Sequence, residues 1–143
     1  MAADMRPLDP RGPRFAAGVT AVVLVLVLVT GSGWLALAQT LAFAVGSYDV
    51  RRQPYALLYR WLVQPRLGPP AELEDPAPVR FAQRVGFVFL AVATVGYLSG
   101  ATAVGVTATA LGLAAAFLNA AFGLCLGCEV YLLLARARTR RTA

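Results

Sequence analysis

Cys125 and Cys128 are the only cysteines in the chain, and Glu129 follows them directly. Cysteines three positions apart lie on the same face of a helix. At the start of a helix, exposed N–H groups and the helix dipole stabilise a thiolate and lower the pKa of its thiol. The spacing therefore indicates thiol redox or sulfur-transfer chemistry, in which Cys125 attacks and Cys128 resolves the mixed disulfide. Glu129 is the candidate proton acceptor, so these three residues form the candidate catalytic set.

Two other interpretations of the cysteine pair stay open. Two thiolates can bind Cu(I) or Zn²⁺, with Glu129, Asn119 or a second subunit supplying further ligands. Buried cysteines also serve as small apolar residues without reactivity. Gly123 and Gly127 have the Gly-x-x-x-Gly spacing of closely packed helices, which favours this structural interpretation. The sequence indicates no particular cofactor, and the identity of any bound metal stays open.

The composition is that of a membrane protein. Of 143 residues, 59% are hydrophobic and 14% are charged, far from the average of soluble domains. The chain contains no histidine, which excludes Ser-His and Cys-His catalytic pairs and histidine metal ligands. All 13 basic residues are arginines that flank apolar segments, and we interpret them as determinants of topology, not as a nucleic-acid surface. The expected partner is the lipid bilayer.

Two stretches carry no charge, 15–48 over 34 residues and 85–128 over 44 residues. A transmembrane helix needs ~20 apolar residues, so each stretch holds two helices joined by a turn. The predicted transmembrane helices are 15–30, 34–47, 81–98 and 101–121. Arginines cluster before the first hairpin, between the hairpins and at the end of the chain, whereas the two turns are uncharged. By the positive-inside rule, both termini and the central loop are cytoplasmic.

The chain contains an internal repeat. Asp-Pro, three further residues and Arg-Phe-Ala occur at 9–16 and again at 75–82, an offset of 66. Each copy precedes an apolar hairpin, which indicates two parallel copies of a two-helix unit. The predicted fold is an all-α membrane protein with four transmembrane helices as two parallel-repeat hairpins, each followed by a short helix. We expect one integral membrane domain over 1–143, with repeats at about 9–66 and 75–136 and a cytoplasmic loop at 67–80.

The segment after each hairpin is predicted to form a short helix of its own. Residues 55–64 are amphipathic and bounded by prolines, as in an interfacial helix. In the second copy, one helix over 101–136 would measure ~54 Å at ~1.5 Å per residue, longer than the ~30 Å hydrocarbon core. We therefore predict a break at 119–123 and a short helix over 124–136, with one continuous tilted helix as the alternative. Gln39 and Asn119 are candidates for lining an internal polar site.

The chain resembles the DUF4395 family of small bacterial integral membrane proteins. The resemblance lies in Asp9-Pro-Arg-Gly-Pro-Arg-Phe-Ala, Arg66-Leu-Gly-Pro-Pro and Asn119-Ala-Ala-Phe-Gly-Leu-Cys-Leu-Gly-Cys-Glu129, and it covers nearly the whole chain. It implies that Asn119, Phe122, Gly123 and Gly127 support the site formed by Cys125, Cys128 and Glu129. It names no activity. Members often accompany thioredoxin-like or rhodanese-type proteins, so the resemblance implies a soluble partner of that kind and a bacterial plasma membrane location.

Three functions are consistent with these observations. The first is a thiol-based membrane protein that passes electrons or sulfur between the cysteine pair and a soluble partner at the cytoplasmic face. The second is a non-enzymatic scaffold or assembly subunit with structural cysteines. The third is a transporter of a small sulfur species or a soft metal. Because the pair is expected near the cytoplasmic side, we expect it to be reduced at rest.

Overall fold

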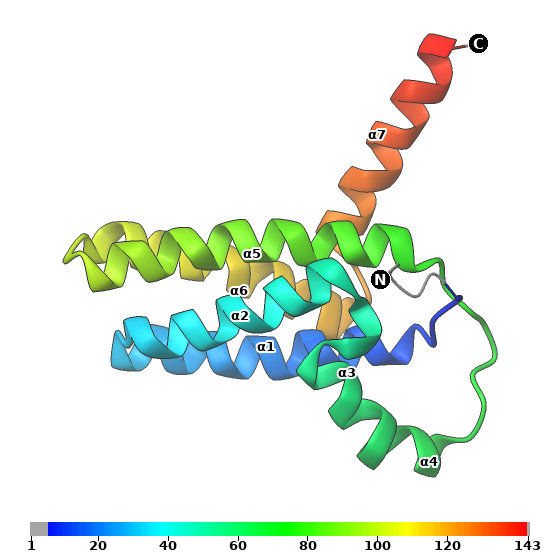
Figure 1. Cartoon of the computed structure of the whole chain (residues 1–143), viewed down its shortest axis with the longest axis horizontal. Helices are drawn as coiled ribbons and strands as arrows, with labels where there is room; N and C mark the ends of the chain where they lie inside the picture. Colours follow the sequence, from blue (N-terminus) through cyan, green and yellow to red (C-terminus); the bar gives the residue numbers. More distant parts are fainter. Residues whose placement is uncertain (1–5, 143) are drawn as a thin grey trace.

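The computed structural model describes residues 6–142, and within them the regular structure is helical apart from one isolated bridge between Leu8 and Glu74. Four long helices and a projecting fifth account for most of these residues (Figure 1). In chain order the segments are α1 (Arg11–Thr30), α2 (Gly33–Tyr48), η1 (Val50–Arg52), α3 (Pro54–Leu58), η2 (Tyr59–Val63), α4 (Gln64–Leu67), α5 (Pro76–Leu98), α6 (Thr102–Phe122) and α7 (Leu126–Thr142).

The two Asp-Pro motifs are helix starts. Asp9 Oδ1 accepts a hydrogen bond from the Arg11 N–H at 3.0 Å. Asp75 Oδ1 accepts one from the Ala77 N–H at 2.9 Å. The first N–H groups of a helix have no partner within it, so a carboxylate placed there satisfies a donor and also complements the positive end of the helix dipole.

Glycines with positive φ lie at both hairpin turns. Gly31 has φ 64° at the end of α1, and Gly100 has φ 87° between α5 and α6. Glycine adopts this left-handed backbone without a Cβ clash, so it stops one helix and lets the chain reverse. Ser32 then begins α2, since its Oγ accepts a hydrogen bond from the Leu35 N–H at 3.1 Å.

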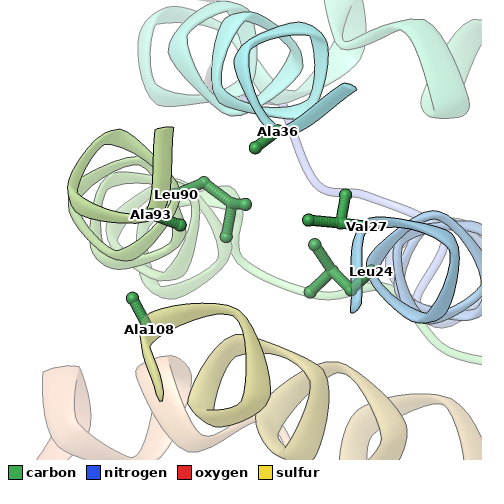
Figure 2. Packing of buried hydrophobic residues seen from close by; sticks show 6 residues of the cluster. All are labelled: Leu24, Val27, Ala36, Leu90, Ala93 and Ala108. Atoms are coloured by element: carbon green, nitrogen blue, oxygen red, sulfur yellow. The ribbon is translucent and has the colours of Figure 1, made fainter. Parts of the chain in front are cut away.

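The four long helices form an antiparallel bundle (Figure 1). α1 packs along α6, and α5 packs along both α2 and α6, whereas α1 and α2 make less contact. Leu24, Val27 and Leu90 are fully buried at the centre. The remaining members of this cluster are the alanines Ala36, Ala93 and Ala108 (Figure 2). Small residues opposite large ones let the helices approach closely. Between helices in lipid, this van der Waals packing stabilises the association, because no hydrophobic effect acts there.

Several polar side chains inside the bundle are paired with one another. Gln39 is 1% exposed, its Nε2 donates to Thr20 Oγ1 at 3.4 Å, and the Tyr55 hydroxyl donates to its Oε1 at 2.6 Å. The hydroxyls of Thr40 and Thr94 lie 3.1 Å apart, between α2 and α5. Gln39 therefore belongs to an internal polar network, as predicted, and the network links α1, α2 and the segment after the first hairpin.

Among residues 6–142, three helices are long and apolar enough to cross a membrane: α1, α5 and α6. Exposed apolar side chains cover their outer faces, for example Val29 at 78% and Val95 at 66%. Lipid is the environment that such a surface fits. α2 contains the predicted second span, 34–47, but it has only 16 residues and measures ~24 Å at ~1.5 Å per residue. Crossing by α2 therefore stays a prediction.

The segments that follow the hairpins leave the bundle at one end, on opposite sides of it (Figure 1). Helical structure runs without a gap over residues 54–67, longer than the predicted 55–64, and its middle turn η2 is π-helical. α6 ends at Phe122, so the predicted break is present and the alternative of one continuous helix is wrong. α7 begins two residues later than predicted and extends to Thr142, beyond the predicted end at residue 136.

Candidate redox site

The break between α6 and α7 positions the cysteine pair. Gly123 has φ 69°, and its N–H donates to the Asn119 carbonyl at 2.9 Å. The Leu124 N–H donates to the Leu118 carbonyl at 3.2 Å. These bonds satisfy carbonyls at the end of α6, and the left-handed glycine turns the chain so that a new helix can start. The cysteines therefore lie at a helix start, outside the membrane-spanning length of α6.

Cys125 caps α7 with its sulfur. The Cys128 N–H donates to Cys125 Sγ at 3.2 Å, and the Glu129 N–H donates to the Cys125 carbonyl at 3.0 Å. This is the geometry in which Ser or Asp usually caps a helix. The two cysteines form a disulfide, with their Cα atoms 5.2 Å apart. The structure thus contains the oxidised pair, whereas the predicted cytoplasmic location led us to expect the reduced pair at rest.

The two sulfurs differ in exposure. Cys128 is 7% exposed and packs in an apolar cluster with Leu8, Val50 and Val79. Cys125 is half-buried at the edge of the same cluster. Cys125 is therefore the more accessible of the two sulfurs, and the Cys128 sulfur is shielded by apolar side chains.

Gly127 brings α7 against α5. A Cβ on Gly127 would lie 2.7 Å from the Ala82 Cα, a backbone atom that cannot rotate away. A glycine at this position could leave the face beside Cys128 open to a partner, but α5 of the same chain fills that space. The two glycines of the Gly-x-x-x-Gly spacing do not share a helix, because Gly123 lies in the turn before α7, and Gly127 alone makes the close approach.

The other predicted residues fall into two groups. Asn119 lines the same cleft as the cysteines, and Gly123 lies against the Arg14 side chain, 3.6 Å from the position of its missing Cβ. Phe122 is 71% exposed and packs edge-to-face on Phe117 with ring centroids 6.2 Å apart. Glu129 is exposed and is not among the residues that line the cleft.

A cleft of about 480 Å³ lies beside the disulfide, between α1, α5, α6 and the start of α7. Cys125 and Cys128 both line it, and its walls are mostly apolar. The acidic residue that shares the cleft with them is Glu74, not Glu129. Burial, and then the charge of Asp75, raise the pKa of Glu74 above its usual value. Sequence reasoning missed Glu74 because it is 51 positions from Cys125 and stands in a loop.

A second polar group lies at the same end of the bundle. Asp9 accepts hydrogen bonds from Arg11 Nη2 at 2.9 Å and from the Tyr59 hydroxyl at 2.7 Å. Burial acts to raise the pKa of Asp9, but the hydrogen bonds of Arg11 and Tyr59 outweigh it and keep that pKa below its usual value. Burial, together with the bond to Asp9, raises the pKa of Tyr59 to about 12. The group ties residues 54–67 to the start of α1.

A metal centre finds little support at these sites. Among residues 6–142, no group of three or more Cys, Asp or Glu side chains is close enough to hold a metal ion. Two thiolates alone leave the coordination of Cu(I) or Zn²⁺ to ligands from elsewhere. The disulfide also uses both sulfurs.

Comparison with known proteins gives a family but no activity. A family model described as "Domain of unknown function (DUF4395)" matches residues 8–136. The match includes both hairpins, the cysteine pair and most of α7. No curated protein and no solved structure matches the chain.

Proposed function

The chain belongs to the DUF4395 family, whose description assigns no activity, and we propose that it is a membrane thiol–disulfide component. In this proposal, Cys125 and Cys128 exchange electrons with a soluble protein of the thioredoxin or rhodanese type. The observation that carries the proposal is the cap of α7, where the Cys125 sulfur accepts the Cys128 N–H at 3.2 Å. A sulfur at a helix start is stabilised as a thiolate by nearby N–H groups and by the helix dipole.

The exchange proceeds by two thiolate attacks. A thiolate of the reduced partner attacks the Cys125 sulfur, the more exposed of the two, and the Cys128 thiolate leaves. The second thiol of the partner then attacks the partner's sulfur in the mixed disulfide. This forms a disulfide within the partner and releases Cys125 as a thiol. The partner is oxidised by two electrons and the membrane pair is reduced. Glu74 lines the cleft beside both sulfurs, so it is a better candidate than Glu129 to take up or supply the protons.

The proposal includes a topology of four spans with both termini in the cytoplasm of a bacterium. The support for α2 as a span comes from its ends, where Trp34 is 71% and Tyr48 is 45% exposed. Trp and Tyr favour the two interfaces of a bilayer, so a helix bounded by them fits a thin crossing. Two basic residues at the disulfide end, Arg14 and Arg80, support the orientation by the positive-inside rule.

One alternative has an observation in its favour. In this alternative, the chain is a membrane scaffold in which the cysteines are structural. The support is the burial of Cys128 in an apolar cluster and the contact of Gly127 with Ala82. Both features pack α7 on α5 and need no reactive sulfur.

Alkylation separates the two functions. Full-length protein in native membranes is reduced and then treated with a maleimide over a range of pH, and each cysteine is followed by mass. The redox function predicts fast alkylation of Cys125 well below pH ~8.5, the ordinary thiol pKa, and prior oxidation must block it reversibly. Slow alkylation of both cysteines up to that pH supports the scaffold.

Trapping identifies the partner. In a Cys128→Ser variant, Cys125 attacks a partner disulfide but no second thiol resolves the mixed disulfide, so the complex accumulates. The matched control is Cys125→Ser, which retains only the buried cysteine. A mixed disulfide in the first variant and none in the second is expected. Equal trapping in both contradicts the assigned roles.

A further inference from the structure

Small residues from three helices create the cleft beside the disulfide. Ala17 on α1, Ala82 on α5, and Ala115 and Ala116 on α6 all line it. Larger side chains at these positions would fill the space between the helices, so the hollow is a property of the sequence. Its volume of about 480 Å³ lies in the range of ~300–1,000 Å³ typical of small-molecule sites, which are mostly apolar with a few polar groups.

The cleft extends from the disulfide toward the middle of the bundle. Leu90, fully buried near the centre of α5, lines its inner end. Leu111 and Val130, which are 55% and 46% exposed, lie among its lining residues. Since α6 is long and apolar enough to cross a membrane, the part of the cleft at Leu111 borders lipid. A ligand that enters from this side must be lipid-soluble.

A few hydrogen-bonding side chains line the cleft near the sulfurs. Asn119 and Gln83 carry amide donors, and Arg14 lies against the turn at Gly123 and donates to the Ala120 carbonyl at 3.3 Å. An acyl chain would make no use of these groups. A flat, apolar molecule with two carbonyl oxygens would use both the walls and the donors.

From these features, and resting on the proposed thiol–disulfide function, we propose that the cleft binds a lipid-soluble quinone that reoxidises the cysteine pair. The dithiol of Cys125 and Cys128 gives up two electrons and two protons, and a bond forms between the sulfurs. The quinone takes up both electrons and both protons, so its two carbonyl groups become the hydroxyls of the quinol. Electrons then pass from the soluble dithiol partner through the pair to the membrane.

The test uses the full chain in lipid nanodiscs, reduced and then freed of reductant without air. A benzoquinone with one short alkyl tail is added, its absorbance is followed, and the remaining thiols are counted by maleimide and mass. One quinone consumed per chain with loss of both thiols is expected. Ala116→Phe places a ring in the cleft and should slow this reaction at least tenfold. Ala114→Phe is the matched control, since Ala114 is exposed on the same helix and should leave the rate unchanged.

Exchange with a soluble thioredoxin-type dithiol is measured on the same samples. Equal quinone rates in Ala116→Phe and Ala114→Phe overturn the quinone site, and so does a wild type that exchanges with the dithiol but leaves the quinone oxidised. In that last case the proposed thiol–disulfide function stands. If the wild type reacts with neither, both proposals fail. Should Ala116→Phe lose dithiol exchange through misfolding, Ala115→Leu fills the same cleft with a smaller change and must slow quinone reduction alone.

Discussion

Residues 54–67 and α7 occupy corresponding places after the two hairpins and are held to the bundle by different forces. Hydrogen bonds hold the first, from Tyr55 to Gln39 and from Tyr59 to Asp9. Close backbone packing and apolar burial hold the second, through Gly127 and Cys128. Polar bonds fix residues 54–67 in place without presenting a reactive group. The packing of α7 instead holds a half-exposed sulfur at the edge of a cleft.

The sharpest test of this difference is Cys125→Ser. A serine hydroxyl still accepts the Cys128 N–H, so the cap and the position of α7 should be retained. The attacked sulfur is gone, and we expect exchange with a soluble dithiol protein to fall at least 100-fold with unchanged helix content by circular dichroism. Retained exchange would mean that chemistry at α7 does not depend on the capping sulfur.

Gly127→Ala tests the packing of α7. Alanine normally stabilises a helix relative to glycine by ~1 kcal/mol, but here the new methyl meets the Ala82 backbone. We expect a loss of ~1–3 kcal/mol in the free energy of unfolding, as in other overpacked sites, and faster alkylation of Cys128 in the reduced protein. Gly18→Ala is the control, since its methyl would have ordinary contact with Ala120 at 3.9 Å. Similar effects of the two changes would contradict a special approach at Gly127.

Tyr59→Phe tests the polar attachment of residues 54–67. It removes the hydroxyl that donates to Asp9 at 2.7 Å and leaves the ring that packs on Phe15. A hydrogen bond to a charged group contributes ~1.5–3 kcal/mol, and we expect a loss of stability near the low end of that range, because Arg11 still pairs with Asp9. Unfolding in denaturant measures the loss. Dithiol exchange should be unchanged, and a parallel loss of exchange would show that the two segments are not independent.

The smallest expected effect concerns pH. The pKa of Asp9 is lower in the folded chain than its usual value of 3.8, so its ionised form stabilises the fold. This contribution is fully present above the unfolded-state pKa and is lost as pH falls through the lowered folded-state pKa. The wild type should therefore exceed Asp9→Asn in stability at pH 7, and the difference should shrink as the pH falls below about 4. A difference that does not vary with pH would assign the effect to shape rather than charge.

Local features of the sequence were sufficient to predict the helices, the uncharged turns and the break before the cysteines. Gly31, Gly100 and Gly123 all adopt the left-handed backbone that glycine favours. Each apolar stretch is longer than one helix that spans a bilayer. This length required a turn within each stretch and an interruption of the helix after each hairpin. These inferences depend on residues close in the chain, and the structure agrees with them.

Contacts between distant residues were beyond sequence reasoning. In the sequence, Gly127 could mark an open face of α7. Only the position of Ala82, 45 residues earlier, reveals that α5 fills this face. Glu129 adjoins the cysteines in sequence, yet Glu74 shares their cleft. The cleft itself follows from alanines and glycines on separate helices, each of which looks like ordinary helix packing until the helices are placed together.

The bridge between Leu8 and Glu74 has a consequence for the symmetry of the molecule. Each backbone N–H donates to the carbonyl of the other residue at 2.7 Å. These positions differ by 66, the same offset that relates the two Asp-Pro motifs, so in the predicted repeat each residue is bonded to its own counterpart. Self-pairing of equivalent positions occurs on a two-fold axis, as in the interface of a symmetric dimer. In the predicted repeat, two half-length chains would make this bond between molecules, whereas the full chain makes it within one and joins the starts of its two halves.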